Sequence, residues 1–230
     1  MTQEYALSIL KTGESAFVTG EPGSGKTYII NEFISWLRER GVEPAITAST
    51  GIAATHIGGL TIHSWSGIGI KEKLTRYDLQ KISENRRAVK RVRETHTLII
   101  DEISMLSAGT LEMVESVCRA IRGGAEPFGG LQVVLVGDFF QLPPIIRRAI
   151  PGDIQEEFFP SENSSSIFAF DSPAWRRLNP AVCYLSEQHR QGDGEFLDIL
   201  SAIRGSSVEE KHRASLRTRI AQSFSGEATK

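Results

Sequence analysis

The sequence predicts an α/β protein built on a doubly wound parallel sheet with helices on both faces. Short apolar runs with strand character alternate along the chain with segments whose apolar residues repeat at helical spacing. Strands separated by helices favour parallel pairing, because the chain must cross the sheet between one strand and the next. The 230 residues can bury a large core, and no internal repeat interrupts the alternation.

Five apolar segments have the length and the residue types of strands. The first, AFVTG, and the fourth, LQVVLVGD, contain β-branched residues that suit a buried strand. The five predicted strands are residues 16–20, 44–49, 97–101, 131–138 and 181–187.

Two segments between these strands carry the helical repeat. In KTYIINEFISWLRERG, residues 26–41, apolar side chains recur at three- and four-residue intervals, and Gly41 ends the pattern. In TLEMVESVCRAIRGG, residues 110–124, the same spacing gives one apolar face and two glycines end it. Each predicted helix therefore has a side that can cover the sheet.

Two segments depart from this regularity. Residues 66–95 are strongly charged and end in RRAVKRVR, and residues 146–167 include SENSSS, so both are predicted as insertions. After residue 205 the chain continues as a polar link and a modest amphipathic helix, with no further strand. We therefore expect one large domain at 1–205, followed by a linker and helix at 206–230.

Charge and composition limit the classes of function. A net charge of −2 argues against a domain that binds nucleic acid chiefly through a basic surface. The N-terminus lacks the features of a secretory signal and no apolar run could cross a bilayer, so we expect a soluble, intracellular protein without a membrane partner. The two cysteines form no CxxC pattern, which favours burial over a disulfide or metal role.

A glycine-rich segment, GEPGSGKT, lies between the first strand and the first helix and fits GxxxxGK[ST]. Such a loop turns backbone N–H groups toward phosphate oxygens, and the helix dipole adds positive potential. Its lysine would neutralise the β- and γ-phosphates, and its threonine would ligate magnesium. The predicted nucleotide-binding residues are Gly20, Glu21, Pro22, Gly23, Ser24, Gly25, Lys26 and Thr27. The alternative is a glycine-rich turn without a ligand.

Two acids follow the third predicted strand, in TLIIDE. Asp101 emerges at the strand end, where it can hold the magnesium shell, and Glu102 comes next. Paired carboxylates are costly there unless a cation or a proton transfer requires them. Glu102 is therefore the candidate base that activates water. Taken alone, the pattern also fits a strand that simply meets solvent.

The fourth predicted strand ends in GDFFQLPPI, residues 137–145, where an acid, two aromatics, a glutamine and two prolines follow an apolar run. If this strand lies beside the P-loop strand, the amide of Gln141 can contact both the γ-phosphate and the attacking water. Gln141 would then sense the nucleotide, and the prolines would stiffen the segment that transmits its movement. The alternative is an ordinary turn with a solvated glutamine.

A last candidate lies in LSEQHRQ, residues 185–191, at the end of the fifth predicted strand. The charge of Arg190 could stabilise charge that develops on a transferred phosphoryl group. An arginine in a loop, taken alone, is more often solvated.

In this order, GEPGSGKT, DEIS, GDFFQLPP and LSEQHRQ resemble the motifs of the petite-integration-frequency (Pif) family of superfamily one DNA helicases. TASTGIAATHIGGLTIHSW looks like the family's DNA-contacting segments, and TLEMVESVCRAIRG with PFGG is similar to its signature helix and the turn after it. The resemblance covers about residues 3–204. It implies a RecA-like P-loop NTPase fold in which the strand before Gln141 lies between the P-loop strand and the Asp101 strand.

The resemblance also implies roles for single residues. Gln3 matches the family's adenine-reading glutamine, so ATP should be preferred over GTP. The implied catalytic residues are Lys26, Glu102, Gln141 and Arg190. The implied cofactor is Mg²⁺, with Thr27 and Asp101 as its protein ligands.

Thr50, Gly51 and His63 fall where the family contacts single-stranded DNA, the implied partner. N–H groups at a helix start can hold a DNA phosphate without net basic charge. Trp65 could stack on a base, although burial in the core is an equal alternative. The basic cluster within residues 86–93 could touch duplex DNA, although a solvated helix face is favoured.

Taken together, the resemblance implies the first motor domain of an ATP-dependent DNA helicase, monomeric, moving 5′ to 3′ and serving DNA repair, recombination and telomere maintenance. The family has a second RecA-like domain, and nothing after residue 204 resembles it. We therefore expect this chain alone to bind Mg-ATP, hydrolyse it slowly and not unwind DNA. The alternatives are a nucleotide-gated binding module that regulates a partner, and a P-loop ATPase acting on proteins or small molecules.

Overall fold

The computed structural model describes residues 1–144, 167–186 and 194–220. The chain divides into two compact units, Met1–Gln188 and His189–Lys230. The second unit contains α9 (Gly194–Arg204) and α10 (Glu210–Ile220), which pack against each other. The expected boundary after residue 205 falls between these two helices, and the division of the chain into functional domains stays a prediction. The expected insertion at 146–167 lies outside the described residues, except for its last position.

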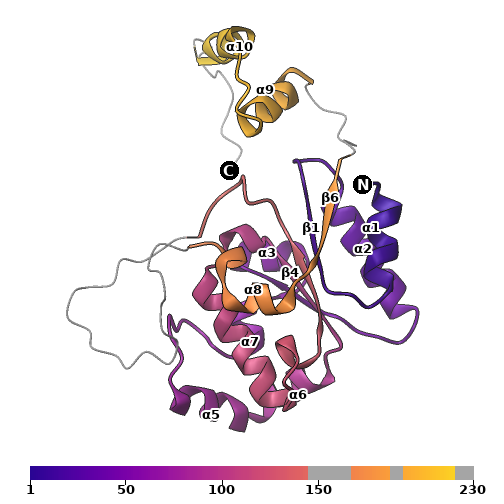
Figure 1. The fold of residues 1–230 in the computed structure, drawn as a ribbon, viewed down its shortest axis with the longest axis vertical. Helices are drawn as coiled ribbons and strands as arrows, with labels where there is room; N and C mark the ends of the chain where they lie inside the picture. The colour runs from indigo at the N-terminus through magenta and orange to yellow at the C-terminus, as the bar shows by residue number, and fades with distance from the viewer. Residues whose placement is uncertain (145–166, 187–193, 221–230) are drawn as a thin grey trace, which may run out of the picture. The chain divides into compact units, whose positions relative to one another are not determined.

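A parallel six-stranded sheet forms the centre of the first unit (Figure 1). The strands are β1 (Ala16–Gly20), β2 (Ala45–Ala48), β3 (Leu60–Thr61), β4 (Thr97–Asp101), β5 (Gln132–Val136) and β6 (Ala181–Leu185). Their order across the sheet is β3-β2-β4-β5-β1-β6, and every neighbouring pair is parallel. The predicted fold class is confirmed. β5 lies between β1 and β4, as the family resemblance implies.

Eight α-helices and three short 3₁₀ helices are described in the first unit. The α-helices are α1 (Gln3–Lys11), α2 (Lys26–Arg38), α3 (Gly51–His56), α4 (Ile62–Ser66), α5 (Arg76–Glu84), α6 (Arg86–Glu94), α7 (Ala108–Arg122) and α8 (Pro173–Leu178). The 3₁₀ helices are η1 (Ile103–Met105), η2 (Pro127–Gly129) and η3 (Ala169–Asp171). None of the helices in the described part of the chain is both long enough and apolar enough to cross a membrane.

Alternating side chains of the sheet enter two separate cores, one on each face. In β4, Leu98 and Ile100 lie in one core and Ile99 lies in the other, as the two-residue period of a strand requires. α1 and α2 cover the Ile99 face, and α4, α6, α7 and α8 contribute to the opposite core (Figure 1). The two cysteines are free and buried, one in each core, as predicted.

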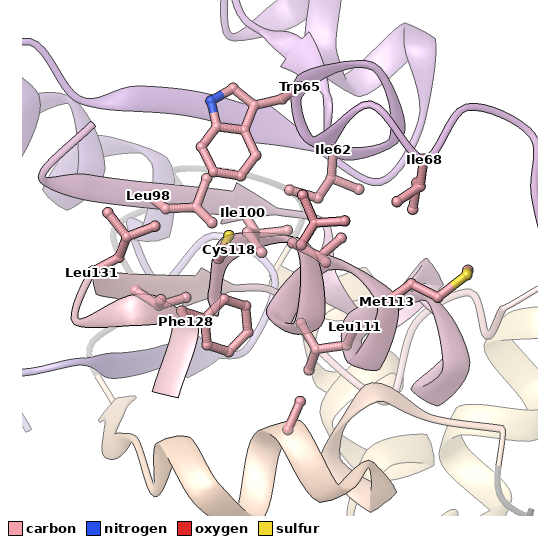
Figure 2. Close-up of a cluster of buried hydrophobic side chains, with 14 of the residues drawn as sticks. Ile62, Trp65, Ile68, Leu98, Ile100, Leu111, Met113, Cys118, Phe128 and Leu131 are labelled. Carbon is pink, nitrogen blue, oxygen red and sulfur yellow. The ribbon is translucent and has the colours of Figure 1, made fainter. Parts of the chain in front are cut away.

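The larger core is organised around α7, whose side chains pack against β4 and the PFGG turn (Figure 2). Figure 2 shows Trp65 from α4 and Phe128 from η2 in the same cluster as Leu98. The helix that resembles the family's signature segment is therefore a central packing element of this face.

The charged segment at 66–95, which the sequence predicted as an insertion, contains the helices α5 and α6. Ile82 of α5 and Val92 of α6 are buried in the larger core, and both helices contact α7. Arg122, at the end of α7, donates through its Nη1 to the carbonyl oxygens of Val92 at 3.1 Å and Thr95 at 2.9 Å. Its Nε donates to the carbonyl of Gly129 at 2.7 Å. One guanidinium thus satisfies carbonyls that would be left open at the end of α6.

Candidate nucleotide-binding site

Three neighbouring strands end at one edge of the sheet, and the segments that follow them form the candidate site. β1 leads into the glycine-rich loop, β4 into Asp101 and Glu102, and β5 into residues 137–141. In open α/β sheets, ligands bind outside the carboxyl ends of such strands. The sheet order thus brings the predicted P-loop, acid pair and glutamine to one edge.

Glycine is required at two positions of the loop. The backbone of Gly25, which precedes α2, has a φ of 86°, and a Cβ there would overlap the side chain of Gln3. A Cβ on Gly20 would lie 2.6 Å from the carbonyl oxygen of Leu185. No side chain caps the start of α2, and N–H groups at such a helix start can bind a phosphate.

Lys26 and Gln3 both bond to the glycine-rich loop. The Lys26 ammonium donates to the carbonyl oxygens of Gly20 at 2.8 Å and Glu21 at 3.1 Å. The Gln3 amide donates to the carbonyl of Ser24 at 3.1 Å. Gln3 therefore lies against the loop, and its role in reading adenine stays a prediction.

The two acids at the end of β4, Asp101 and Glu102, are partly shielded from water. Burial raises the pKa of Asp101, and the Glu102 N–H, which donates to Asp101 Oδ1 at 2.9 Å, partly offsets this effect. Burial also raises the pKa of Glu102, the charge of Asp101 adds to the rise, and Lys26 opposes it. Glu102 has the left-handed backbone angles φ 52° and ψ 45°, an uncommon and strained conformation for this residue.

The predicted magnesium ligands come from different elements. Thr27 in the first turn of α2 and Asp101 at the end of β4 line one narrow crevice. A hydroxyl and a carboxylate are the oxygen donors that Mg²⁺ prefers, and Mg²⁺ commonly keeps waters for its remaining positions. The residues present therefore fit the ion.

The segment after β5 folds as a tight turn that ends at Gln141. The Gln141 N–H donates to the carbonyl of Asp138 at 2.9 Å, and the exposed Gln141 amide reaches toward Asp138 Oδ2. Asp138 is only 1 % exposed, and its charge contributes to the raised pKa of Glu102. The sequence prediction assigned Asp138 no role, although an acid after a buried strand is the same signal that identified Asp101.

The predicted DNA-contacting residues follow β2 and β3. Thr50 caps α3, its hydroxyl accepting from the Ala53 N–H at 3.2 Å, and Gly51 is exposed at the start of this helix. His63 is half-buried on α4, and burial lowers its pKa, so the neutral imidazole is favoured. Their roles at DNA stay predictions.

Trp65 is 2 % exposed and lies in the larger core among Ile62 and Leu98 (Figure 2). The prediction that its ring stacks on a base is therefore wrong, and the core alternative holds. Burial of the large indole surface among apolar side chains stabilises the fold, which explains why this ring lies in the core.

The basic cluster of α6 is only partly available to a partner. Arg91 donates to the carbonyls of Trp65 at 2.7 Å and Ser64 at 2.9 Å, and Arg93 donates to the carbonyl of Ile121. These two side chains hold neighbouring helix ends. The predicted Arg190 lies outside the described residues.

The glycine-rich loop places a lysine at the start of a helix, and acids stand at the ends of neighbouring strands of the parallel sheet. This arrangement defines a P-loop nucleoside triphosphatase with a RecA-like fold. The chain belongs to the PIF1-like helicase family, whose model matches residues 3–214.

The relatives of this chain are named as ATP-dependent DNA helicases. It is 52% identical over 212 residues to the ATP-dependent DNA helicase Pif1 of Psychrobacter, covering 89% of this chain and 30% of that protein. It is 41% identical over 207 residues to the Saccharomyces cerevisiae helicase RRM3, covering 89% of this chain and 27% of that protein. The chain thus spans about a third or less of these relatives.

Solved structures agree with the sequence relatives. The Pif1 helicase from Candida albicans superposes with a TM-score of 0.82 at 36% identity, covering 97% of this chain and 48% of that one. Bacteroides Pif1 bound to single-stranded DNA superposes with a TM-score of 0.79 at 30% identity, covering 98% of this chain and 50% of that one. The predicted family and RecA-like fold are confirmed.

Proposed function

We propose that this chain is the ATP-binding motor domain of an ATP-dependent DNA helicase. The whole helicase would couple hydrolysis of Mg-ATP to 5′ to 3′ movement on single-stranded DNA. The observation that carries the proposal is the convergence of Lys26, Asp101, Glu102 and Gln141 at adjacent strand ends, in a member of the PIF1-like helicase family. The same motor underlies the DNA repair, recombination and telomere roles we expect. It would act as a monomer in a compartment that contains DNA.

Binding begins at the glycine-rich loop. The phosphate oxygens of ATP take the place of the Gly20 and Glu21 carbonyls as acceptors of the Lys26 ammonium, because a phosphate is the stronger acceptor. The open N–H groups at the start of α2 complete the phosphate cradle. Gln3, already bonded to Ser24, reads the adenine edge.

Hydrolysis follows an in-line attack on the γ-phosphate. Glu102 accepts a proton from a water, the water oxygen bonds to the γ-phosphorus, and the bond to the β–γ bridging oxygen breaks. Thr27 and Asp101 would hold Mg²⁺, which neutralises charge on the leaving diphosphate. Arg190 would stabilise charge on the transferred phosphoryl group.

DNA is proposed to lie across the segments that follow β2 and β3. Thr50 and Gly51 would contact a phosphate through backbone and hydroxyl groups, and His63 would act beside them as a neutral hydrogen-bonding group. A neutral grip of this kind suits a chain whose net charge is −2.

The test is ATP hydrolysis by this chain with and without single-stranded oligo-dT, with Glu102→Gln as the blank. We expect hydrolysis that Glu102→Gln removes and that the oligonucleotide stimulates. Hydrolysis without stimulation would leave the proposed ATP site standing and place the coupling to DNA in the family's second motor domain. Absence of ATP binding would overturn the proposal.

A further inference from the structure

Asp138 is a buried acid that the proposed hydrolysis steps do not use. It follows β5 directly and is 1 % exposed. A carboxylate in such a place is costly unless its oxygens are bonded. Asp138 Oδ1 accepts from the Phe140 N–H at 3.1 Å, and the backbone carbonyl of Asp138 accepts from the Gln141 N–H at 2.9 Å. The acid therefore shapes the turn that carries Gln141.

The second carboxylate oxygen faces the side chain of Gln141. The distance from Gln141 Nε2 to Asp138 Oδ2 is 3.4 Å. An ionised carboxylate can only accept hydrogen bonds, whereas an amide has a donating end and an accepting end. The end of the amide that turns toward Asp138 is therefore its NH₂ group. One N–H and the carbonyl oxygen of Gln141 are left to face outward.

The turn rests on a packed aromatic base. Phe139, between Asp138 and Gln141 in the sequence, has its ring centre 5.3 Å from that of Phe17 and 4.7 Å from that of Phe170. The rings of Phe139 and Phe170 meet edge to face, at 89° between their planes, a geometry that aromatic pairs prefer and that adds to the stabilisation from apolar burial. The backbone of the turn is thus held on one side, while Phe140 on the other side is 71% exposed.

We propose that Asp138 is a positioning residue for ATP hydrolysis, which holds the Gln141 amide with its carbonyl oxygen toward the attacking water and its second N–H toward the γ-phosphate. This inference rests on the proposed function. Asp138 acts through Gln141 and does not touch the nucleotide. An amide held this way accepts a hydrogen bond from the water and directs the lone pair of the water oxygen at the γ-phosphorus.

Asp138→Asn tests the proposal because asparagine has nearly the same size but can donate as well as accept, so the Gln141 amide is free to reverse. We expect binding of a fluorescent ATP analogue to stay within about twofold, while single-turnover hydrolysis falls about tenfold. The single-turnover rate of hydrolysis by Gln141→Ala should fall by a similar factor. The double variant should hydrolyse ATP no more slowly than Gln141→Ala, because both changes remove the same effect, the positioning of water by the Gln141 amide.

Phe140→Ala, in the same turn but exposed, is the matched control and should hydrolyse ATP at the unchanged rate. Normal hydrolysis by Asp138→Asn, or losses that multiply in the double variant, would overturn the inference and leave the proposed function standing. If the unchanged chain shows no hydrolysis that Glu102→Gln removes, both fail together.

A second measurement needs no change at Asp138. In nuclear magnetic resonance spectra, the side-chain NH₂ pair of Gln141 can be assigned by its loss in Gln141→Ala. One of its two protons should be shifted downfield and protected from exchange. Two equivalent, freely exchanging protons would contradict the bond to Asp138.

Discussion

At the scale of single residues, the site separates binding from chemistry. Lys26 bonds to the glycine-rich loop, whereas Glu102 directly follows β4, the next-but-one strand from β1. A change at either position therefore affects a different step. The charge of Lys26 also opposes the rise in the pKa of Glu102, so the two residues are coupled through the field they share.

Lys26→Ala should abolish measurable ATP affinity, because it removes the ammonium that is proposed to exchange the Gly20 and Glu21 carbonyls for phosphate oxygens. Glu102→Gln should bind ATP as tightly as the unchanged chain and hydrolyse it roughly 10²–10⁴ times more slowly. Equilibrium binding and single-turnover rates separate these outcomes, with Lys11→Ala as the lysine control. Equal loss of binding in both variants would contradict the assignments.

At the scale of elements, the covering layer of the larger core depends on polar contacts at helix ends. Arg122 joins the end of α7 to the last carbonyls of α6 and to the PFGG turn. Thr75 and Asp78 cap α5 reciprocally, and Lys71 pairs with Asp78 at 2.8 Å. These contacts attach a charged segment to an apolar core.

Arg122→Ala should lower the free energy of unfolding by about 2–4 kcal/mol, because it leaves several carbonyls without a donor. Thermal or denaturant unfolding measures the loss. Arg87→Ala, which removes an exposed guanidinium from the neighbouring helix, should change stability by less than about 0.5 kcal/mol. Equal effects of the two variants would show that Arg122 is not a structural link.

Asp78 gives this layer a dependence on pH. Hydrogen bonds from the side chains of Lys71 and Thr75 lower the pKa of Asp78 to about 2. The native pKa lies below the unfolded one, so Asp78 stabilises the fold above about pH 4, and this contribution is lost as the pH falls toward 2. Asp78→Asn should therefore lower the melting temperature at pH 6, and the gap should shrink between pH 4 and pH 2. A constant gap would contradict the role of the charge.

The sequence predicted the elements whose local pattern matches their final environment. The five longer strands are apolar runs, and β2 and β4 end near the positions expected from their residues. β3 has two residues, too few to leave a pattern. The sequence did not predict α5 and α6, because their apolar residues Ile82 and Val92 are widely spaced among arginines and lysines.

The candidate site was predictable where one motif carries the chemistry and was missed where tertiary packing decides. The P-loop needs only a short stretch of sequence, so its residues were found together. The burial of Trp65 depends on α7 and β4, which lie far along the chain. The sequence analysis assigned no role to Asp138, because its side-chain partner, Gln141, is known only from the structure of the turn.

At the scale of the whole molecule, the chain spans about half of the Pif1 structures it resembles. Movement along DNA requires two domains that close on ATP and open on release. The first unit contains every described residue of the nucleotide site. Binding and chemistry can therefore be expected of this chain without the full motor cycle.

This 230-residue chain should bind Mg-ATP and single-stranded DNA but release no labelled strand from a forked duplex. Gel-based unwinding assays at saturating ATP, with a two-domain Pif1 helicase as the positive control, measure this. Robust unwinding by the chain alone would contradict the prediction.

The left-handed backbone of Glu102 implies a trade-off between activity and thermal stability. A residue that adopts this conformation readily, such as asparagine, should relieve the strain and raise the melting temperature of Glu102→Asn by a few degrees. The same change removes the proposed base, so the more stable variant should be inactive. The strained backbone at Glu102 would then be a cost in stability that the proposed chemistry requires.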